Sequence, residues 1–99
     1  MLQYIEAHLA DTIEITDIAE TAGISISECL RCFKHSIGTT PIQYVKQLRI
    51  QKAAELLTYT TLSITEVALE CGFQEMSYFL KTFRQAHGCT PTEFRERTH

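Results

Sequence analysis

Residues 16–44 read TDIAETAGISISECLRCFKHSIGTTPIQY, and residues 65–94 repeat the pattern as TEVALECGFQEMSYFLKTFRQAHGCTPTEF. The copies are offset by 49 residues up to Gly23 and Gly72, and by 50 residues after them. A repeat of this length indicates two copies of one supersecondary unit. The second copy gains its extra residue between Gly72 and Phe83, so we expect the change in a turn or at the start of a helix.

Apolar residues recur mostly at helical spacing along the chain, and no segment shows the sustained alternation of a strand. Ser25 with Glu28, and Ser63 with Glu66, form Ser-x-x-Glu capping boxes that predict two helix starts. The first of these helices should run to about His35 and bury Cys29, Cys32 and Phe33. A helix thus begins two residues after Gly23, which should end the helix before it.

Two further starts combine a threonine N-cap with a proline at the first helical position, at Thr40-Pro41 and Thr90-Pro91. The first predicts a long helix to about Leu57, and the second predicts a short last helix. In the second copy a helix should span Glu75 to about Ala86, although Gln74 stands where a stronger N-cap is usual. The chain therefore reads as all-α with about seven helices. The expected division is 1–40, a linking helix at 41–57, and 58–99.

Composition narrows the class of protein. The 99 residues include four cysteines, too few for a dense disulfide scaffold, and no apolar run approaches the roughly 20 residues that span a bilayer. We therefore expect a cytoplasmic protein. The net charge is −3, but residues 1–28 hold six acids and no Lys or Arg, whereas residues 29–99 hold nine bases and six acids. This asymmetry fits a basic binding face; charge alone fits an ordinary mixed surface equally well.

Two helices joined by a short glycine-containing turn, with basic residues outward on the second, describe a helix-turn-helix. The pattern occurs at 14–36 and again at 63–87. One such pattern is weak evidence, because helical hairpins are common. Two copies at a fixed period, each followed by a glycine and a Thr-Pro helix start, are much stronger.

The second copy carries a family resemblance through Ala68-x-x-x-Gly72-Phe73, Ser77-Tyr78-Phe79, Phe83-Arg84 and Gly88-x-Thr90-Pro91. With Ile18-Ala19, Gly23, Arg31, Phe33-Lys34, Gly38, Pro41 and Tyr44 of the first copy, the chain resembles the DNA-binding domain of AraC/XylS-type bacterial transcription regulators. The resemblance covers nearly the whole chain. It implies two homeodomain-like helix-turn-helix subdomains on a rigid linking helix, which place two recognition helices in successive major-groove segments of double-stranded DNA.

The resemblance also implies partners and contacts. RNA polymerase and, in a full-length chain, an N-terminal sensing or receiver domain are the further partners it implies. Candidate base-reading residues, carried over by position, are Ser27, Leu30, Arg31, Met76, Ser77, Leu80 and Lys81. Arg31 is the strongest of them, since its guanidinium can bind guanine O6 and N7. Leu30 and Leu80 replace small polar residues, so they either contact thymine methyls or pack inward. Each position could otherwise belong to a solvated helix face.

Phosphate contacts are predicted from basic side chains and from helix N-termini, whose N–H groups favour anions. The candidates are Lys34, Thr40, Lys46, Arg49, Lys52, Arg84, Thr90 and Arg95. Ordinary solubilising charge is the alternative for the basic residues among them.

The cysteines raise a second possibility. Cys29-x-x-Cys32 with His35 could hold soft ligands on a helix, as in a metal or redox sensor. However, Cys29 aligns with Phe79 of the second copy, and the pair alone is two ligands short of a zinc site. We therefore expect core packing for Cys29, Cys71 and Cys89, and no metal or cofactor.

Enzymatic classes lack support in the sequence. The four histidines are far apart, and the chain contains no Gly-rich phosphate loop, nucleophile elbow or clustered carboxylates. The sequence thus predicts a DNA-binding transcription regulator and not an enzyme. The alternative function is a helical protein-interaction module that does not bind DNA.

Overall fold

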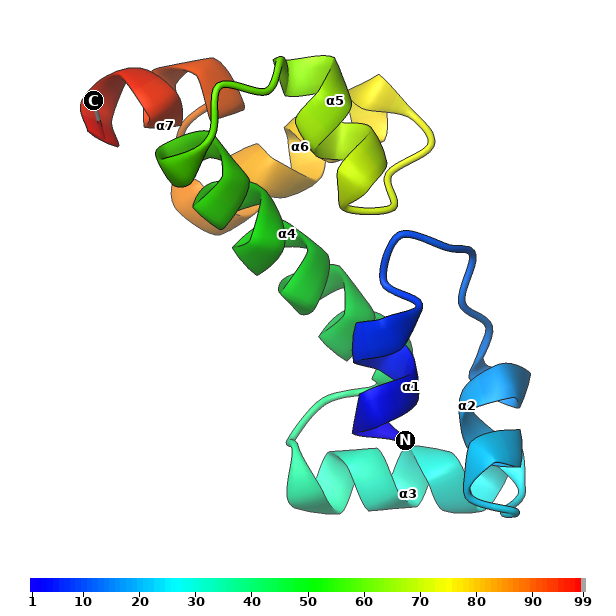
Figure 1. Ribbon diagram of the computed structural model, residues 1–99. Helices are drawn as coiled ribbons and strands as arrows, with labels where there is room; N and C mark the ends of the chain where they lie inside the picture. Colours follow the sequence, from blue (N-terminus) through cyan, green and yellow to red (C-terminus); the bar gives the residue numbers. More distant parts are fainter. Residues whose placement is uncertain (99) are drawn as a thin grey trace. The chain divides into compact units, whose positions relative to one another are not determined.

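The computed structural model describes residues 1–98, and within them the chain forms seven α-helices and no strand (Figure 1). The helices are α1 (Leu2–Ala7), α2 (Ile15–Thr21), α3 (Ile26–Ser36), α4 (Pro41–Tyr59), α5 (Ile64–Glu70), α6 (Met76–His87) and α7 (Pro91–Thr98). The all-α fold predicted from the repeat is confirmed.

The chain divides into two compact units, which we call unit 1 (Met1–Leu48) and unit 2 (from Arg49 onward). Unit 1 contains α1 to α3 and the first part of α4. Unit 2 contains the rest of α4 with α5 to α7. Each unit thus holds one copy of the repeated helix-turn-helix, α2 with α3 or α5 with α6.

The core of unit 1 gathers side chains from all four of its helical segments. Ile5, Ile18 and Cys29 are fully buried, and Phe33 and Val45 are nearly so. Fully burying an aliphatic or aromatic side chain of this size stabilises the fold by about 1.5–3 kcal/mol. This small apolar cluster holds α3 in place and leaves its other face in solvent.

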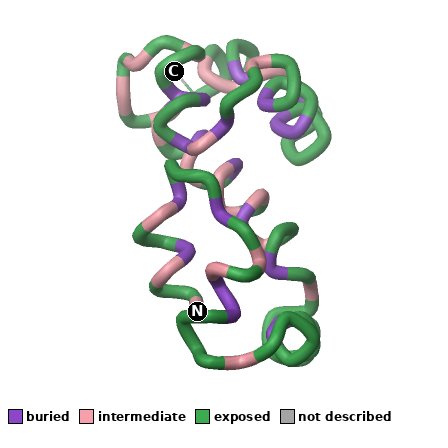
Figure 2. The backbone as a smooth tube through the Cα atoms, turned by 90° about the vertical axis from the view of Figure 1, so that its right-hand side faces the viewer, coloured by how far each residue is buried: buried purple, intermediate pink, exposed green. Residues whose placement is uncertain are grey.

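The core of unit 2 is richer in aromatic rings. The rings of Phe79 and Phe83 lie 6.0 Å apart between centroids, and Phe94 meets Phe83 edge-on at 5.4 Å. Leu57 and Val67 complete a fully buried centre with Phe79 and Phe83. Buried and exposed positions alternate along the helices at short intervals (Figure 2), as one-sided burial requires.

Helix α4 serves both cores. Val45 belongs to the cluster of unit 1, whereas Ile50 and Ala53 belong to the cluster of unit 2. The helix ends at Tyr59, two residues later than predicted. No glycine or proline marks this end, and the Thr58 hydroxyl donates to the carbonyl of Ala54 at 2.8 Å within the last turn.

The starts of α3 and α6 differ. The Ser25 hydroxyl accepts the Glu28 N–H and the Glu28 carboxylate accepts the Ser25 N–H, both at 3.2 Å, so the predicted capping box of α3 is confirmed. The N-cap of α6 is Glu75 and not Gln74, and Glu75 makes no side-chain capping bond. The extra residue of the second copy therefore lies in the turn before α6, where Gly72 adopts φ +88°.

One core prediction is wrong. Cys32 is exposed, although its counterpart Thr82 in α6 is buried. The reason is local to unit 1, where Cys32 borders an open cavity beside Met1 and Leu2 instead of entering the apolar cluster.

Candidate nucleic-acid interface

The exposed face of α3 carries most of the residues predicted to meet DNA in the first copy. Ser27, Leu30, Arg31 and Lys34 occupy positions i, i+3, i+4 and i+7, which share one side of a helix. All four are exposed, whereas Cys29 and the nearby Phe33 are buried on the opposite side. The structure therefore brings the candidate base-reading residues together with a candidate phosphate contact.

The face of α6 repeats this arrangement at an offset of 50 residues. Ser77, Leu80, Lys81 and Arg84 are exposed at the same four positions, and Phe79 lies on the buried side. Each face carries one serine, one leucine, a long basic side chain in the middle and a second basic side chain about one turn further on. We call these the α3 face and the α6 face.

The two leucines do not pack inward. Leu30 and Leu80 are each 39% exposed, a degree of exposure that leaves their methyl groups at the surface of their respective faces. Of the two roles open to them from the sequence, contact with a thymine methyl remains compatible with this placement.

Two residues at the start of α6 behave differently from expectation. Met76, a candidate base reader, is only partly exposed and packs against the core of unit 2. Tyr78 was absent from the predicted site, yet it is 49% exposed, and its ring contacts Phe73 with centroids 5.9 Å apart. The Ser77-Tyr78-Phe79 element could have identified Tyr78 as a candidate, since a tyrosine hydroxyl can bind phosphate.

The basic residues of α4 are less free than their sequence predicts. Lys46, Arg49 and Lys52 are all half-buried. Lys52 Nζ donates to the carbonyl of Glu70 at 3.4 Å, at the C-terminal end of α5 where the helix dipole favours a cation. Burial lowers the pKa of Arg49, and the charge of Tyr78 opposes this shift.

The N-termini of α4 and α7 differ in electrostatics. The Thr40 hydroxyl accepts the Gln43 N–H at 3.2 Å, and the Thr90 hydroxyl accepts the Glu93 N–H at 3.1 Å. At α7 the Glu93 carboxylate also accepts the Thr90 N–H at 3.0 Å, and these bonds with Thr90 lower the pKa of Glu93. The α7 terminus thus already holds an anion, whereas the corresponding residue of α4 is the neutral Gln43.

Arg95 is engaged inside unit 2 in a way the sequence did not indicate. Its Nη1 donates to the carbonyl of Leu62 at 2.6 Å, its Nε to that of Leu57 at 3.1 Å, and its Nη2 to that of Thr60 at 3.4 Å. The guanidinium therefore ties α7 to the end of α4 and the following loop. This structural role differs from the phosphate contact predicted for it.

The charge difference between the two units is smaller than the difference between residues 1–28 and residues 29–99. Unit 1 holds six acids and three bases, because Arg31, Lys34 and Lys46 join the acidic N-terminal segment. Unit 2 holds six acids and six bases. Neither unit is basic as a whole, so any attraction for a polyanion must come from the local faces.

Comparison with known proteins identifies the architecture. Residues 18–97 match the model of a helix-turn-helix domain, the family HTH_18. A solved AraC-type transcriptional regulator from Chromobacterium violaceum superposes with a TM-score of 0.91 at 34% identity, covering 98% of this chain and 87% of that one. The chain belongs to the AraC-type helix-turn-helix family.

Two further relatives bear on the AraC-type domain. The uncharacterized HTH-type transcriptional regulator YdeC of Bacillus subtilis is 40% identical over 97% of this chain, which covers 33% of YdeC. The DNA-binding domain of AdpA, solved in complex with a target DNA, superposes with a TM-score of 0.92 at 27% identity, over 97% of this chain and 86% of that domain. The chain spans about a third of the length of the first curated relatives it matches.

Family membership confirms the class predicted from the sequence, a DNA-binding transcription-regulator domain and not an enzyme. The fold prediction is confirmed by the same structures. No helix within residues 1–98 is both long enough and apolar enough to cross a membrane.

Proposed function

We propose that this chain binds double-stranded DNA sequence-specifically and regulates transcription, with α3 and α6 each entering a major-groove segment. The observation that carries the proposal is the pair of matching exposed faces, each backed by a separate buried core. A major groove about 12 Å wide admits one α-helix whose outward side chains meet base edges. One chain with two such helices would read successive groove segments of a site that need not be palindromic.

Base reading falls to the middle of each face. Arg31 is exposed one turn into α3, where its fork could bind guanine O6 and N7. Lys81 holds the equivalent position in α6 and would donate as a point charge, with less directional discrimination. The flanking Leu30 and Leu80 supply methyl groups that suit thymine. Ser27 and Ser77 remain candidates for polar base contacts.

Phosphate binding is assigned to the ends of the faces and to α4. Lys34 and Arg84 extend the two faces toward the helix C-termini and are exposed. The α4 N-terminus after Thr40 is the better anion site, because Gln43 leaves it without the carboxylate that Glu93 places at α7. Lys46, Arg49 and Lys52 remain candidates from α4. Arg95 is left out because its donors already serve unit 2.

The test is binding to duplex DNA selected from a random pool, measured by fluorescence anisotropy at several salt concentrations. Arg31→Ala should weaken binding to the selected site by about 1–3 kcal/mol and relax the preference at one base pair. Lys34→Ala should weaken all sequences alike and reduce the salt slope by about one. Arg97→Ala, an exposed arginine outside both faces, is the matched control.

Footprinting on the selected site addresses the two-helix arrangement. We expect two protected major-groove segments whose centres are separated by about one helical turn, 10 to 10.5 base pairs. An absence of salt-sensitive DNA binding at low ionic strength would favour the alternative of a protein-interaction module. A single protected segment would contradict the use of both faces.

The longer relatives support a wider assembly. Since the chain covers only about a third of YdeC, we propose that the domain works beside a sensing or receiver domain in a longer protein and contacts RNA polymerase at the promoter. In vitro transcription from a promoter carrying the selected site, with and without the full-length protein, tests this. An unchanged transcript level with the site fully occupied would argue against a regulatory role.

A further inference from the structure

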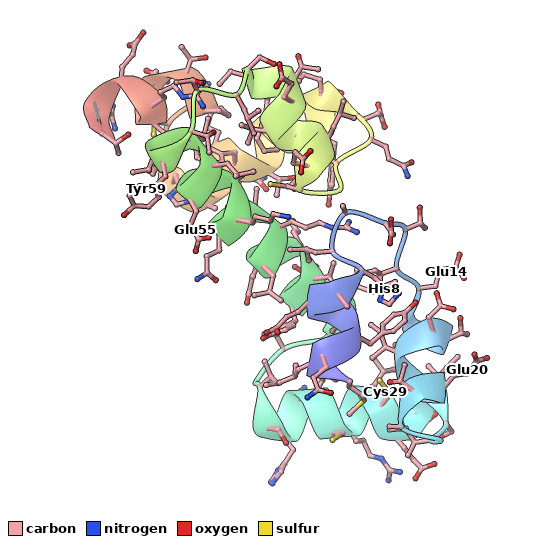
Figure 3. All side chains as sticks on the ribbon, in the orientation of Figure 1. His8, Glu14, Glu20, Cys29, Glu55 and Tyr59 are labelled. Carbon is pink, nitrogen blue, oxygen red and sulfur yellow. The ribbon has the colours of Figure 1, made fainter. Side chains whose placement is uncertain are left out.

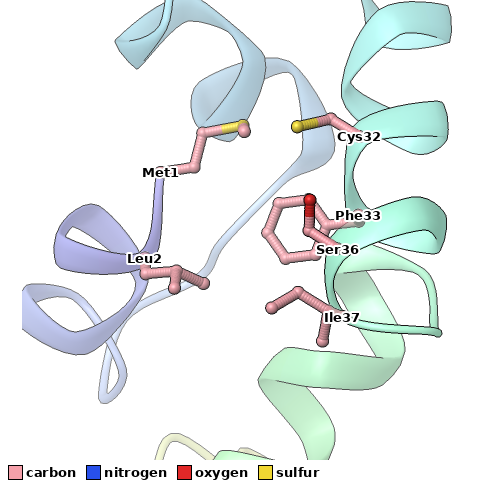
Figure 4. Close-up of a pocket in the computed structure, with 6 residues that line it drawn as sticks. All are labelled: Met1, Leu2, Cys32, Phe33, Ser36 and Ile37. Atoms are coloured by element: carbon pink, nitrogen blue, oxygen red, sulfur yellow. The ribbon is translucent and has the colours of Figure 1, made fainter.

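Three sulfur atoms gather between the start of α1 and the middle of α3, inside unit 1. Cys29 Sγ lies 3.8 Å from the thioether sulfur of Met1, although the residues are 28 positions apart. Cys32 follows Cys29 by one helical turn on α3. Figure 4 shows its sulfur pointing at that of Met1 across the mouth of a cavity of about 220 Å³. Figure 3 shows Cys29 on α3.

The cavity gives the sulfurs different exposures. Cys29 is fully buried, Cys32 is exposed and Met1 is partly exposed. Phe33 and Leu2 supply an apolar wall beside the two accessible sulfurs. A small ion could therefore enter from the cavity and meet Met1 and Cys32 first, with Cys29 behind them.

The one sulfur–sulfur distance between Met1 and Cys29 matches that of two ligands around one metal ion. With metal–sulfur bonds of about 2.3 Å, three sulfurs in a trigonal plane lie about 4.0 Å apart. The 3.8 Å between Met1 and Cys29 is close to this edge.

We propose that Met1, Cys29 and Cys32 form a trigonal Cu(I) site. Two thiolates and a thioether are soft ligands, which select Cu(I) over harder divalent ions. Zinc would require four ligands, and within residues 1–98 no three His, Cys, Asp or Glu side chains are placed to hold a metal. Binding one Cu(I) displaces the two thiol protons to solvent, involves no change in oxidation state, and leaves the centre with one net negative charge.

The first test is a Cu(I) titration of the reduced protein under anaerobic conditions, in competition with a chromophoric Cu(I) chelator. We expect one Cu(I) per chain. Cys32→Ser should weaken binding by more than ~100-fold, beyond what the loss of an outer-shell partner costs. Because Cys32 is exposed, this variant should keep the fold, which circular dichroism checks. Ser36→Ala, which changes the same cavity wall without removing a sulfur, is the matched control.

The second test reads the thioether directly by NMR of the methionine methyl groups. Cu(I) should shift the methyl resonance of Met1 and leave that of Met76, in unit 2, in place as an internal standard. Equal Cu(I) affinity in the wild type and in Cys32→Ser would overturn the site. So would stoichiometric Cu(I) binding with an unmoved Met1 methyl, because the thioether would then not be a ligand.

Discussion

We predict that Arg95 stabilises unit 2 and does not bind DNA phosphate, and substitution of this residue tests both statements. Its guanidinium donates to three backbone carbonyls, at 2.6, 3.1 and 3.4 Å, from residues 33 to 38 positions earlier in the chain. A hydrogen bond from a charged donor contributes about 1.5–3 kcal/mol. The two shorter bonds, each taken at the lower end of that range, give about 3 kcal/mol, and the 3.4 Å bond adds little.

We therefore expect Arg95→Met to lower the free energy of unfolding by about 3 kcal/mol. Arg95→Lys should lower it by about 1.5 kcal/mol, since one ammonium can replace at most one of the two good bonds. For a domain of this size a loss of 1 kcal/mol corresponds to about 4–8 °C in Tm. Urea unfolding followed by circular dichroism measures the loss, with the exposed Arg97→Met as a control that should stay within about 0.5 kcal/mol of the wild type.

DNA binding by the same variants separates the two possible roles of Arg95. Under conditions where every variant is folded, the salt slope of DNA binding should be unchanged in Arg95→Met. The reasoning is refuted if Arg95→Met keeps wild-type stability while the salt slope falls by about one, because that result marks a phosphate contact.

Three further predictions concern backbone geometry, pH and thiol chemistry. Gly88 ends α6 at φ +73° with open space where a Cβ would lie, so Gly88→Ala should cost about 1–2 kcal/mol in a urea titration and Gly88→Asn less; an unchanged midpoint for alanine would contradict the conformational origin of this cost. Hydrogen bonds that the Glu28 carboxylate accepts from the backbone N–H and the side chain of Ser25 lower the pKa of Glu28, so the stability it contributes is present above its ordinary pKa of 4.5 and is lost as the pH falls through the folded value. Glu28→Gln should flatten that acid limb of the urea midpoint, whereas Glu96→Gln serves as the exposed comparison; parallel acid limbs in Glu28→Gln and wild type would exclude the effect. Burial raises the pKa of Cys71 to about 11, so a thiol reagent at about pH 8 should label Cys32 rapidly and Cys71 only on unfolding; rapid labelling of Cys71 in the folded protein would show that the core of unit 2 opens readily.

Local chemistry accounts for the parts of the fold that the sequence predicted well. The Ser25 capping box, the helix end at Gly23, which adopts φ +65°, and the Thr-Pro start of α4 are each determined within four residues of chain, and all three are observed. The pairing of exposed and buried positions on α3 and α6 follows from helical periodicity alone. Periodicity therefore predicts which side of α3 and of α6 is exposed, whereas the choice of DNA-reading residues on that side came from the resemblance to the AraC/XylS-type domain.

The differences arise where contacts span long sequence distances. The carbonyls that Arg95 binds lie at the end of α4 and in the loop after it, and no periodicity links them to α7. Cys32 aligns with the buried Thr82, but its own surroundings depend on where Met1 and Leu2 fall against α3. The third sulfur of the proposed copper site could not be predicted for the same reason.

A helix shared by two cores also makes their stabilities interdependent. The boundary between units 1 and 2 divides α4 into a segment of eight residues and a segment of eleven. Both segments are shorter than the about 12–15 residues that an isolated helix needs to be even marginally stable in water. Each half therefore relies on its own apolar cluster and on the helical turns that the other half continues. Melting one core should fray the neighbouring one from the junction inward, so that unfolding propagates along the chain, as it does between adjacent repeats of a solenoid.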